Sequence, residues 1–119
     1  MPSTTEEIAQ KLVAYLGENA NVAAIDALYD DAIETVEADP VRTRSGKATV
    51  RASMQGFADT HSFRYTHISE PLVSGSNFAL HLRFEATNTA SGQGFAVDEI
   101  GVYTVKEGHI VREQFFYDV

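Results

Sequence analysis

The sequence contains no cysteine, which excludes a disulfide framework, a thiolate nucleophile and a zinc site built on thiolates. It also has no apolar run near the roughly 18 residues that a membrane-spanning helix needs. Positive charge is scarce, and the net charge of −8 disfavours contact with nucleic acid or with an anionic membrane surface. The N-terminal segment MPSTTEEIAQ carries acids where a signal peptide would carry basic residues. We therefore expect a soluble, cytoplasmic protein with no nucleic-acid or membrane partner.

Several motifs of known chemistry are absent as well. The four histidines are His61, His67, His81 and His109, and none of them forms an HxxxH or HExxH motif. No serine stands in a GxSxG motif, and neither the GxGxxG pattern nor the P-loop pattern occurs. The sequence therefore predicts neither a metal site nor a nucleotide cofactor.

The chain does have enough apolar residues for one core. Its 119 residues are 44% hydrophobic, which suits a single domain over residues 1–119 and is too short for two ordinary domains.

The first half of the chain shows helical patterns. Either Ser3 with Glu6 or Thr4 with Glu7 forms a capping box before an amphipathic helix that stops near Gly17. Asn21 or a close neighbour is expected to cap a second helix. A short strand is predicted over residues 32–37, and Ser45-Gly46 precedes a third helix that runs to about residue 59 and carries Met54 on its apolar stripe.

The second half of the chain changes to strand patterns. Residues 62–73, 77–88, 94–106 and 109–118 are rich in aromatic and β-branched residues and are separated by glycine-containing turns. Three helices followed by an antiparallel meander predict an α+β domain whose helices cover one face of the sheet. Alternation places Leu82 and Phe84 on the inner face and Arg83 and Glu85 on the outer face.

The segment between the second and third helices contains Asp39-Pro40-Val41. Pro40 biases Asp39 toward an extended conformation, so we expect the Asp39 carboxylate at the point where a strand stops. Turn chemistry alone also explains an Asp-Pro step, as a polar strand end. The nearby acids Asp26, Asp30, Asp31, Glu34 and Glu37 are most simply a solvated face.

The Asp-Pro-Val segment, the order of elements and the aromatic ending EGHIVREQFFYDV resemble the ketosteroid isomerase-like and SnoaL-like branch of the nuclear transport factor 2-like superfamily. The resemblance implies a cone in which helices and a curved sheet enclose a cavity. It also implies that Asp39 is a general base whose pKa is raised by partial desolvation. Members of this superfamily commonly form homodimers, and here the outer sheet face would carry Ile100, Val102, Ile110 and Phe116.

Matching the strands to this family turns the odd-numbered residues of 95–105 and of 113–117 inward. We predict that the inward-facing residues of these strands and of the elements above bind the ligand. The predicted ligand-binding residues are Met54, Tyr65, His67, Leu82, Phe84, Glu99, Tyr103, Glu113, Phe115 and Tyr117. The facing of Tyr65 and His67 is left open by an uncertain gap in the pattern. Glu99 and Glu113 are each either an acid for catalysis or a sheet residue at the cavity rim.

The chain departs from two branches of the family. Ketosteroid isomerases pair their base with a tyrosine and a protonated aspartic acid, but the matching positions hold Leu12 and Gly101 here. Limonene epoxide hydrolases use an arginine between two acids, which Arg83 and Glu85 resemble, yet alternation places both outside and Phe115 takes the position of the second acid. Steroid isomerisation and epoxide hydrolysis are therefore not the favoured activities.

The favoured hypothesis is a cavity that binds a small hydrophobic molecule, either carbonyl-bearing or polycyclic. If the protein is an isomerase or polyketide cyclase-like enzyme, Asp39 acts as the base, and Tyr103 and Tyr117 orient a ligand oxygen. The alternatives are a ligand-binding or association module without catalysis, and a scaffold that uses only the sheet.

Overall fold

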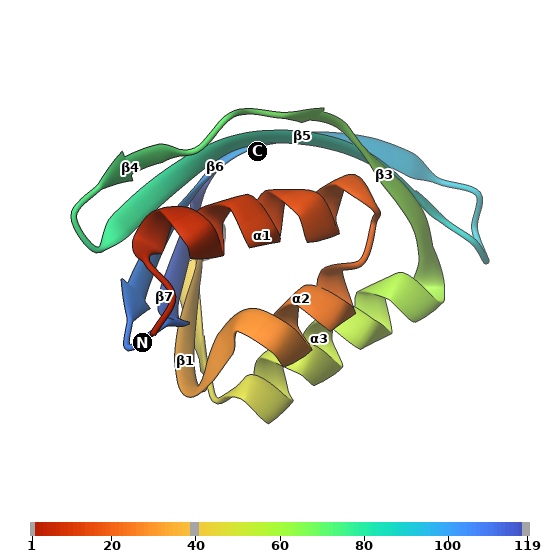
Figure 1. Ribbon diagram of the computed structural model, residues 1–119. Coiled ribbons are helices and arrows are strands. Elements are labelled where there is room, and N and C mark those ends of the chain that lie inside the picture. The colour runs from red at the N-terminus through yellow and green to blue at the C-terminus, as the bar shows by residue number, and fades with distance from the viewer. Residues whose placement is uncertain (1, 39–40, 118–119) are drawn as a thin grey trace.

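The computed structural model describes residues 2–38 and 41–117. Three helices, α1 (Thr5–Gly17), α2 (Asn21–Leu28) and α3 (Lys47–Thr60), lie on one side of a curved sheet (Figure 1). The strands are β1 (Tyr29–Ala38), β2 (Val41–Ser45), β3 (His61–Ile68), β4 (Leu72–Ser74), β5 (Asn77–Asn88), β6 (Gly94–Lys106) and β7 (His109–Phe116). No helix within the described ranges is long and apolar enough to cross a bilayer.

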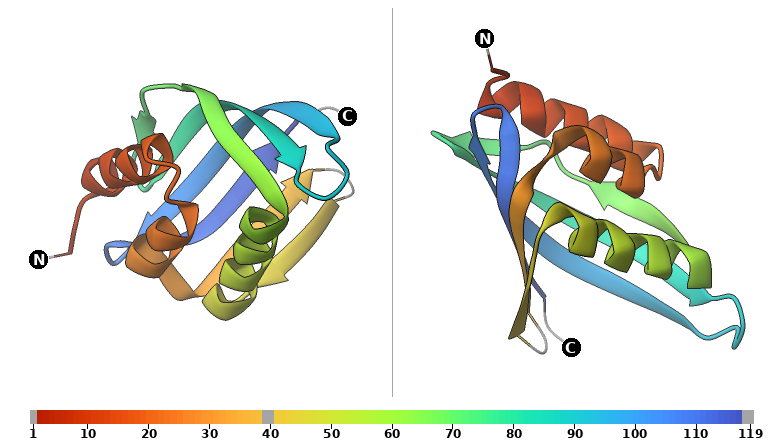
Figure 2. Two further views of the ribbon diagram at one scale, coloured as in Figure 1. Left: turned by 90° about the vertical axis from the view of Figure 1, so that its right-hand side faces the viewer. Right: turned by 90° about the horizontal axis from the view of Figure 1, so that it is seen from below.

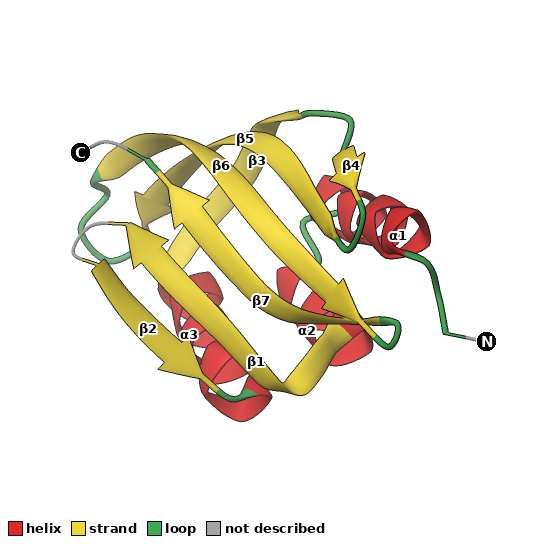
Figure 3. Ribbon diagram, turned by 90° about the vertical axis from the view of Figure 1, so that its left-hand side faces the viewer, coloured by secondary structure: helices red, strands yellow, loops and turns green. Residues whose placement is uncertain are grey.

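The sheet has the order β2-β1-β7-β6-β5-β3, with β4 added against β5. β1 and β7 run parallel, and the other neighbouring strands run antiparallel. The two views in Figure 2 show the sheet curving around the helices, and Figure 3 shows its outer face with all three helices behind it. The predicted α+β architecture, three helices on a curved and mainly antiparallel sheet, is confirmed.

A capping box fixes the start of α1. The Thr4 hydroxyl accepts a hydrogen bond from the Glu7 backbone N–H at 3.1 Å, and the Glu7 carboxylate accepts one from the Thr4 N–H at 2.9 Å. Of the two capping boxes that the sequence allows, the Thr4 box is the one that forms. The helix then buries Ile8, Leu12 and Leu16 against the sheet.

Buried and exposed side chains alternate along β5, and the buried ones form part of the core. Phe78, Leu80 and Leu82 are almost completely buried, whereas Arg83 and Glu85 are exposed, as the period of two predicts. α3 contributes only Val50 to the fully buried set. The remaining inward residues of α3 therefore face a space between the helix and the sheet.

The strands differ from the sequence prediction in three places. β1 starts at Tyr29, three residues before the predicted strand, and its hairpin partner β2 was not predicted, because the segment RTRS has no apolar alternation. The predicted strand 62–73 is divided into β3 and β4 around Glu70 and Pro71. Proline has no N–H to donate to a ladder, which accounts for the break.

Two local predictions are corrected. Ile110, expected on the outer face, is fully buried because the β6–β7 register shifts between Thr104 and Val105, and a shift of one residue turns the side chain to the other face. Asn21 does not cap α2, since Ala20 occupies that position without a side-chain hydrogen bond. The Asn21 amide instead donates to the Tyr65 hydroxyl at 2.8 Å.

Candidate functional site

A cavity of about 440 Å³ lies between the concave face of the sheet and the helices. All three helices and strands β1, β2, β3, β5, β6 and β7 contribute to its lining. Most of the lining is apolar, and the predicted residues found in it are Met54, Tyr65, Leu82, Phe84, Glu99, Tyr103, Glu113, Phe115 and Tyr117. These side chains come from positions far apart in the sequence, and the curvature of the sheet brings them together.

His67 was predicted to bind the ligand, but the structure places it outside this lining. Its side chain is exposed, and its ring centroid lies 5.0 Å from that of His81 on the outer face. The β3–β5 register shifts between Tyr65 and His67, so residues on either side of this bulge no longer follow one alternation. Tyr65 therefore faces the cavity and His67 does not.

Asp39, the predicted general base, lies outside the described residues together with Pro40. The residues before and after it, Ala38 and Val41, pair across the β1–β2 hairpin.

The β1–β2 hairpin also supplies charged residues that the sequence prediction missed. Glu37, assigned to a solvated acidic face, lines the cavity, where Arg44 forms an ion pair with it at 3.7 Å and the Tyr117 hydroxyl donates to it at 3.2 Å. Arg42 also lines the cavity. Alternation of Thr35 with Glu37 and of Arg42 with Arg44 was the available signal, and it became meaningful only once the hairpin was known.

Glu113 is the most buried acid of the site, with 4% of its surface exposed. Tyr29 and Thr35 of β1 donate hydroxyl hydrogen bonds to its two carboxylate oxygens, the Thr35 bond at 2.9 Å. Burial raises the pKa of Glu113 to about 7, although these two hydrogen bonds act in the opposite direction; nearby Glu37 raises it further. Glu113 is therefore fixed in place, with a pKa near neutral pH.

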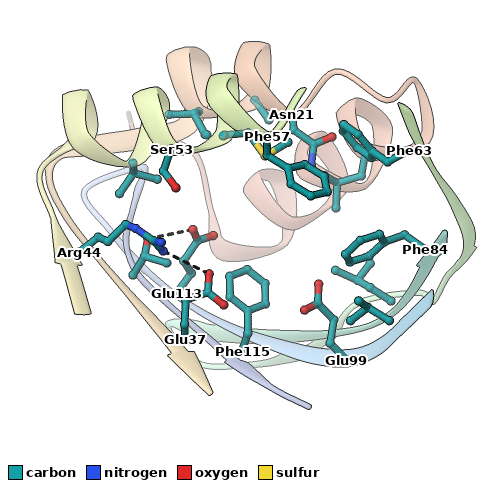
Figure 4. A pocket seen from close by; sticks show the side chains of 18 of the residues that line it. Asn21, Glu37, Arg44, Ser53, Phe57, Phe63, Phe84, Glu99, Glu113 and Phe115 are labelled. Carbon is teal, nitrogen blue, oxygen red and sulfur yellow. Dashed lines mark hydrogen bonds and ion pairs between the residues drawn. The ribbon is translucent and has the colours of Figure 1, made fainter. Parts of the chain in front are cut away.

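Glu99 is the second acid with a raised pKa, and it is held differently. Burial raises its pKa to about 7, with added repulsion from Glu37 and Glu113. It forms no hydrogen bond or ion pair with any residue that the structure describes. Figure 4 shows its carboxyl group pointing into the cavity, with the ring of Phe115 between it and the pair Glu37 and Glu113.

Aromatic side chains form the wall on the Glu99 side of the cavity (Figure 4). Phe57 of α3 lies 5.3 Å from Phe63 of β3 between ring centroids, and Tyr65 lies 5.8 Å from Phe84. Burial raises the pKa of Tyr65 to about 12, so its hydroxyl stays neutral. The cavity thus has an aromatic side and a charged side, with Arg44, Glu37 and Glu113 on the charged side.

This arrangement can transfer protons at neutral pH. A carboxyl group with a pKa near 7 is present in both protonation states and can act as acid or base. Within the described ranges, no cluster of histidines and acids has the geometry to hold a metal ion. The side chains that line the cavity supply acid–base groups and apolar walls.

Comparison with known proteins identifies the family. A family model for the SnoaL-like domain matches residues 3–117. One similar structure is a Mesorhizobium loti protein described as a proposed SnoaL-like polyketide cyclase and as a carbohydrate phosphatase. Its sequence is 33% identical to this chain, and the two structures superpose with a TM-score of 0.87 over 97% of this chain and 100% of that chain. No match was found among the curated proteins.

Two more distant structures share the fold. A nuclear transport factor 2-like protein of unknown function from Burkholderia pseudomallei has 14% identity and a TM-score of 0.78 over 98% of this chain and 92% of that chain. A protein with a ketosteroid isomerase-like fold from Catenulispora acidiphila, in complex with trimethylamine, has 15% identity and a TM-score of 0.76 over 95% and 86% of the two chains. The resemblance predicted from the sequence is confirmed.

Proposed function

This chain belongs to the SnoaL-like domain family, and from that membership we propose that its cavity binds a small, mostly apolar, carbonyl-bearing molecule and transfers protons on it. Isomerases and cyclases carry out this type of reaction. The proposal is supported most by Glu99, a partly buried carboxyl group that faces the cavity and has no partner among the described residues.

The state of Glu99 supports its role as the group that moves the proton. Unpaired acids are rare inside proteins, because an ionised carboxylate loses its hydration there. With a pKa of about 7, Glu99 can accept a proton without being too weak a base at neutral pH. The aromatic wall beside it would keep water away from a reacting carbon.

Glu113 has a different role in this proposal. Tyr29 and Thr35 hold both of its carboxylate oxygens, so it is less free to approach a ligand. Its charge acts on Glu99, because the ionised carboxylate of Glu113 raises the pKa of Glu99. Glu113 is therefore a group that adjusts the proton affinity of Glu99.

The proposed step is proton abstraction next to a carbonyl group. The Glu99 carboxylate takes a proton from the adjacent carbon, the C–H electron pair moves toward the carbonyl, and the carbonyl oxygen becomes an enolate. Returning the proton to a different carbon isomerises the molecule, whereas attack of the enolate carbon on a second carbonyl closes a ring. Asp39 remains a second candidate base, proposed from its Asp-Pro-Val segment.

Hydrogen–deuterium exchange tests this step without knowledge of the natural substrate. The protein is incubated with 2-tetralone in D₂O, and loss of the proton signals next to the carbonyl is followed by NMR. We expect the wild-type protein to accelerate exchange and Glu99→Gln to slow it by about 100-fold, the lower range for a general base. Glu85→Gln is the matched control, because Glu85 is an exposed glutamate on the outer face.

The outcomes separate the candidate bases. Fast exchange by Glu99→Gln with loss of exchange in Asp39→Asn would move the base to Asp39. Exchange no faster than in buffer, across a set of aromatic ketones, would contradict proton transfer in this cavity.

Non-catalytic binding is the second candidate function. It is favoured by Leu12 and Gly101, which replace the two oxyanion donors of ketosteroid isomerases, and removal of one such donor typically costs about 3 kcal/mol of transition-state stabilisation. A binding protein would melt at a higher temperature with hydrophobic ketones, since ligands that bind only the native state stabilise it, while exchange stays at the buffer rate.

A further inference from the structure

Tyr103 carries a hydroxyl group in the cavity that has no partner among the residues the structure describes. Its side chain is 2% exposed, its ring stacks on Phe78 with centroids 4.7 Å apart, and Phe115 meets it edge-on at 6.1 Å. The residue lines the cavity, yet its hydroxyl forms no hydrogen bond with any residue that the structure describes. Tyr117, the other tyrosine expected to orient a ligand oxygen, already donates to Glu37.

Gly101 makes the space in which this hydroxyl lies. A Cβ atom at position 101 would stand 2.9 Å from the Tyr103 hydroxyl oxygen and 3.1 Å from the Phe115 ring. Real Cβ atoms essentially never approach other atoms as closely as 2.9 Å, so a side chain at position 101 would displace the Tyr103 hydroxyl. Ketosteroid isomerases have a protonated aspartic acid at the position of Gly101. Here the glycine leaves space at that position, and the Tyr103 hydroxyl lies in it.

Tyr103 and Glu99 line the cavity from the same strand, β6. Tyr103 leans over position 101, and Glu99 is the next residue of β6 on the same face, about 7 Å further along the strand. Both side chains line the cavity, so a ligand bound there lies in the space that both of them face.

The surroundings keep the Tyr103 hydroxyl protonated, so it remains a hydrogen-bond donor. Burial is the main cause that raises the pKa of Tyr103 well above its ordinary value, and Glu113, Tyr65, Glu99 and Glu37 add to it. The hydroxyl oxygen is not among the fully buried side-chain atoms that lack a partner, so it is open to the cavity, where a ligand can reach it. An oxygen atom of a ligand would supply the missing partner.

We propose that the Tyr103 hydroxyl donates a hydrogen bond to an oxygen of the bound molecule, so that the cavity selects ligands with a carbonyl oxygen attached to an apolar ring system. This inference rests on the proposed function for the identity of the cavity as the ligand site. During proton abstraction by Glu99, the oxygen that gains electrons is the one that faces Tyr103.

Two probes of the same shape test this inference. 2-Acetylnaphthalene offers a carbonyl acceptor, and 2-isopropenylnaphthalene replaces that oxygen by a CH₂ group. We expect the wild-type protein to bind the ketone about tenfold more tightly than the hydrocarbon, which corresponds to one hydrogen bond. Tyr103→Phe is expected to remove this preference by weakening ketone binding alone.

The controls separate this role from a structural one. Tyr15→Phe changes a partly buried tyrosine of α1 outside the cavity lining and should keep the tenfold preference. Gly101→Ala should lose it, because the added methyl group displaces the Tyr103 hydroxyl. Tyr103→Phe should melt no lower than the wild type, and the carbonyl stretch of the bound ketone should return to the frequency it has in an apolar solvent.

Failure of the inference differs from failure of the proposed function. An unchanged ketone preference in Tyr103→Phe would overturn the inference and leave the Glu99 exchange experiment unaffected. Absence of binding by both probes to the wild-type protein would overturn the proposed ligand site and the inference with it.

Discussion

Glu113 shows how burial and hydrogen bonding compete at a single carboxyl group. Two hydroxyl donors favour its ionised form, whereas loss of hydration favours the protonated form and has the larger effect. The folded-state pKa of about 7 lies above the ordinary value of 4.5. The native protein therefore holds more protons than the unfolded chain between these two values.

This difference predicts that stability falls as the pH rises. Protonation of Glu113 contributes fully to stability below about pH 4.5, and the contribution is lost as the pH rises through 7. A shift of this size corresponds to about 3 kcal/mol. Urea unfolding at pH 5 and pH 8 should show the loss in the wild-type protein and a smaller loss in Glu113→Gln.

Glu85→Gln provides the control, since this exposed acid should leave the pH dependence unchanged. Equal losses in the wild type and Glu113→Gln would show that Glu113 has an ordinary pKa.

Sequence patterns predict which way single residues face better than they predict their partners. Alternation and family matching placed Leu82, Phe84 and Glu99 toward the interior, where the structure has them. The donors to Glu113 are 84 and 78 residues away in the chain, and only the parallel pairing of β1 with β7 brings them to it. No local signal marks Tyr29 or Thr35 as partners of an acid.

At the scale of elements, two of the register shifts in the sheet limit what alternation can predict. The alternation rule assumes an unbroken register, and it fails beyond the shifts at Tyr65 and at Thr104. His67 consequently faces outward and Ile110 inward. By contrast, the positions of the helices are well predicted from apolar spacing, which acts within one element, although of the helices that the structure describes only α1 has a side-chain cap.

The capping box of α1 gives a prediction at this scale. Thr4→Ala should lower the free energy of unfolding by about 1 kcal/mol, because it removes the side-chain acceptor of the Glu7 N–H. Ser3→Ala is the matched control, since Ser3 was the alternative cap and does not serve as one. A loss of the same size in both variants, measured by urea unfolding, would show that the box is not responsible.

At the scale of the whole molecule, the two faces of the sheet are covered differently. The three helices cover only the concave face of the sheet (Figure 2), and the cavity lies between them and that face. On the outer face, Ile100 is 47% and Phe116 is 50% exposed. Apolar residues among charged ones, such as Arg83 and Arg112, are typical of a surface that is covered in an assembly.

We propose that this face forms a homodimer. The wild-type protein should sediment as a dimer at micromolar concentration, and Phe116→Glu should sediment as a monomer, because a charge would be buried without a partner. Leu72→Glu changes another exposed apolar residue, on β4, and should remain dimeric. A wild-type protein with the mass of a monomer would contradict the proposal.

The central claim is that the cavity holds two glutamic acids whose protons can move near neutral pH. A pH titration of protein labelled with ¹³C at the glutamate carboxyl carbon tests it most directly, with Glu99→Gln and Glu113→Gln identifying the two signals. Both signals are expected to titrate near pH 7, well above the ordinary value of 4.5. Titration of both signals near pH 4.5 would contradict it.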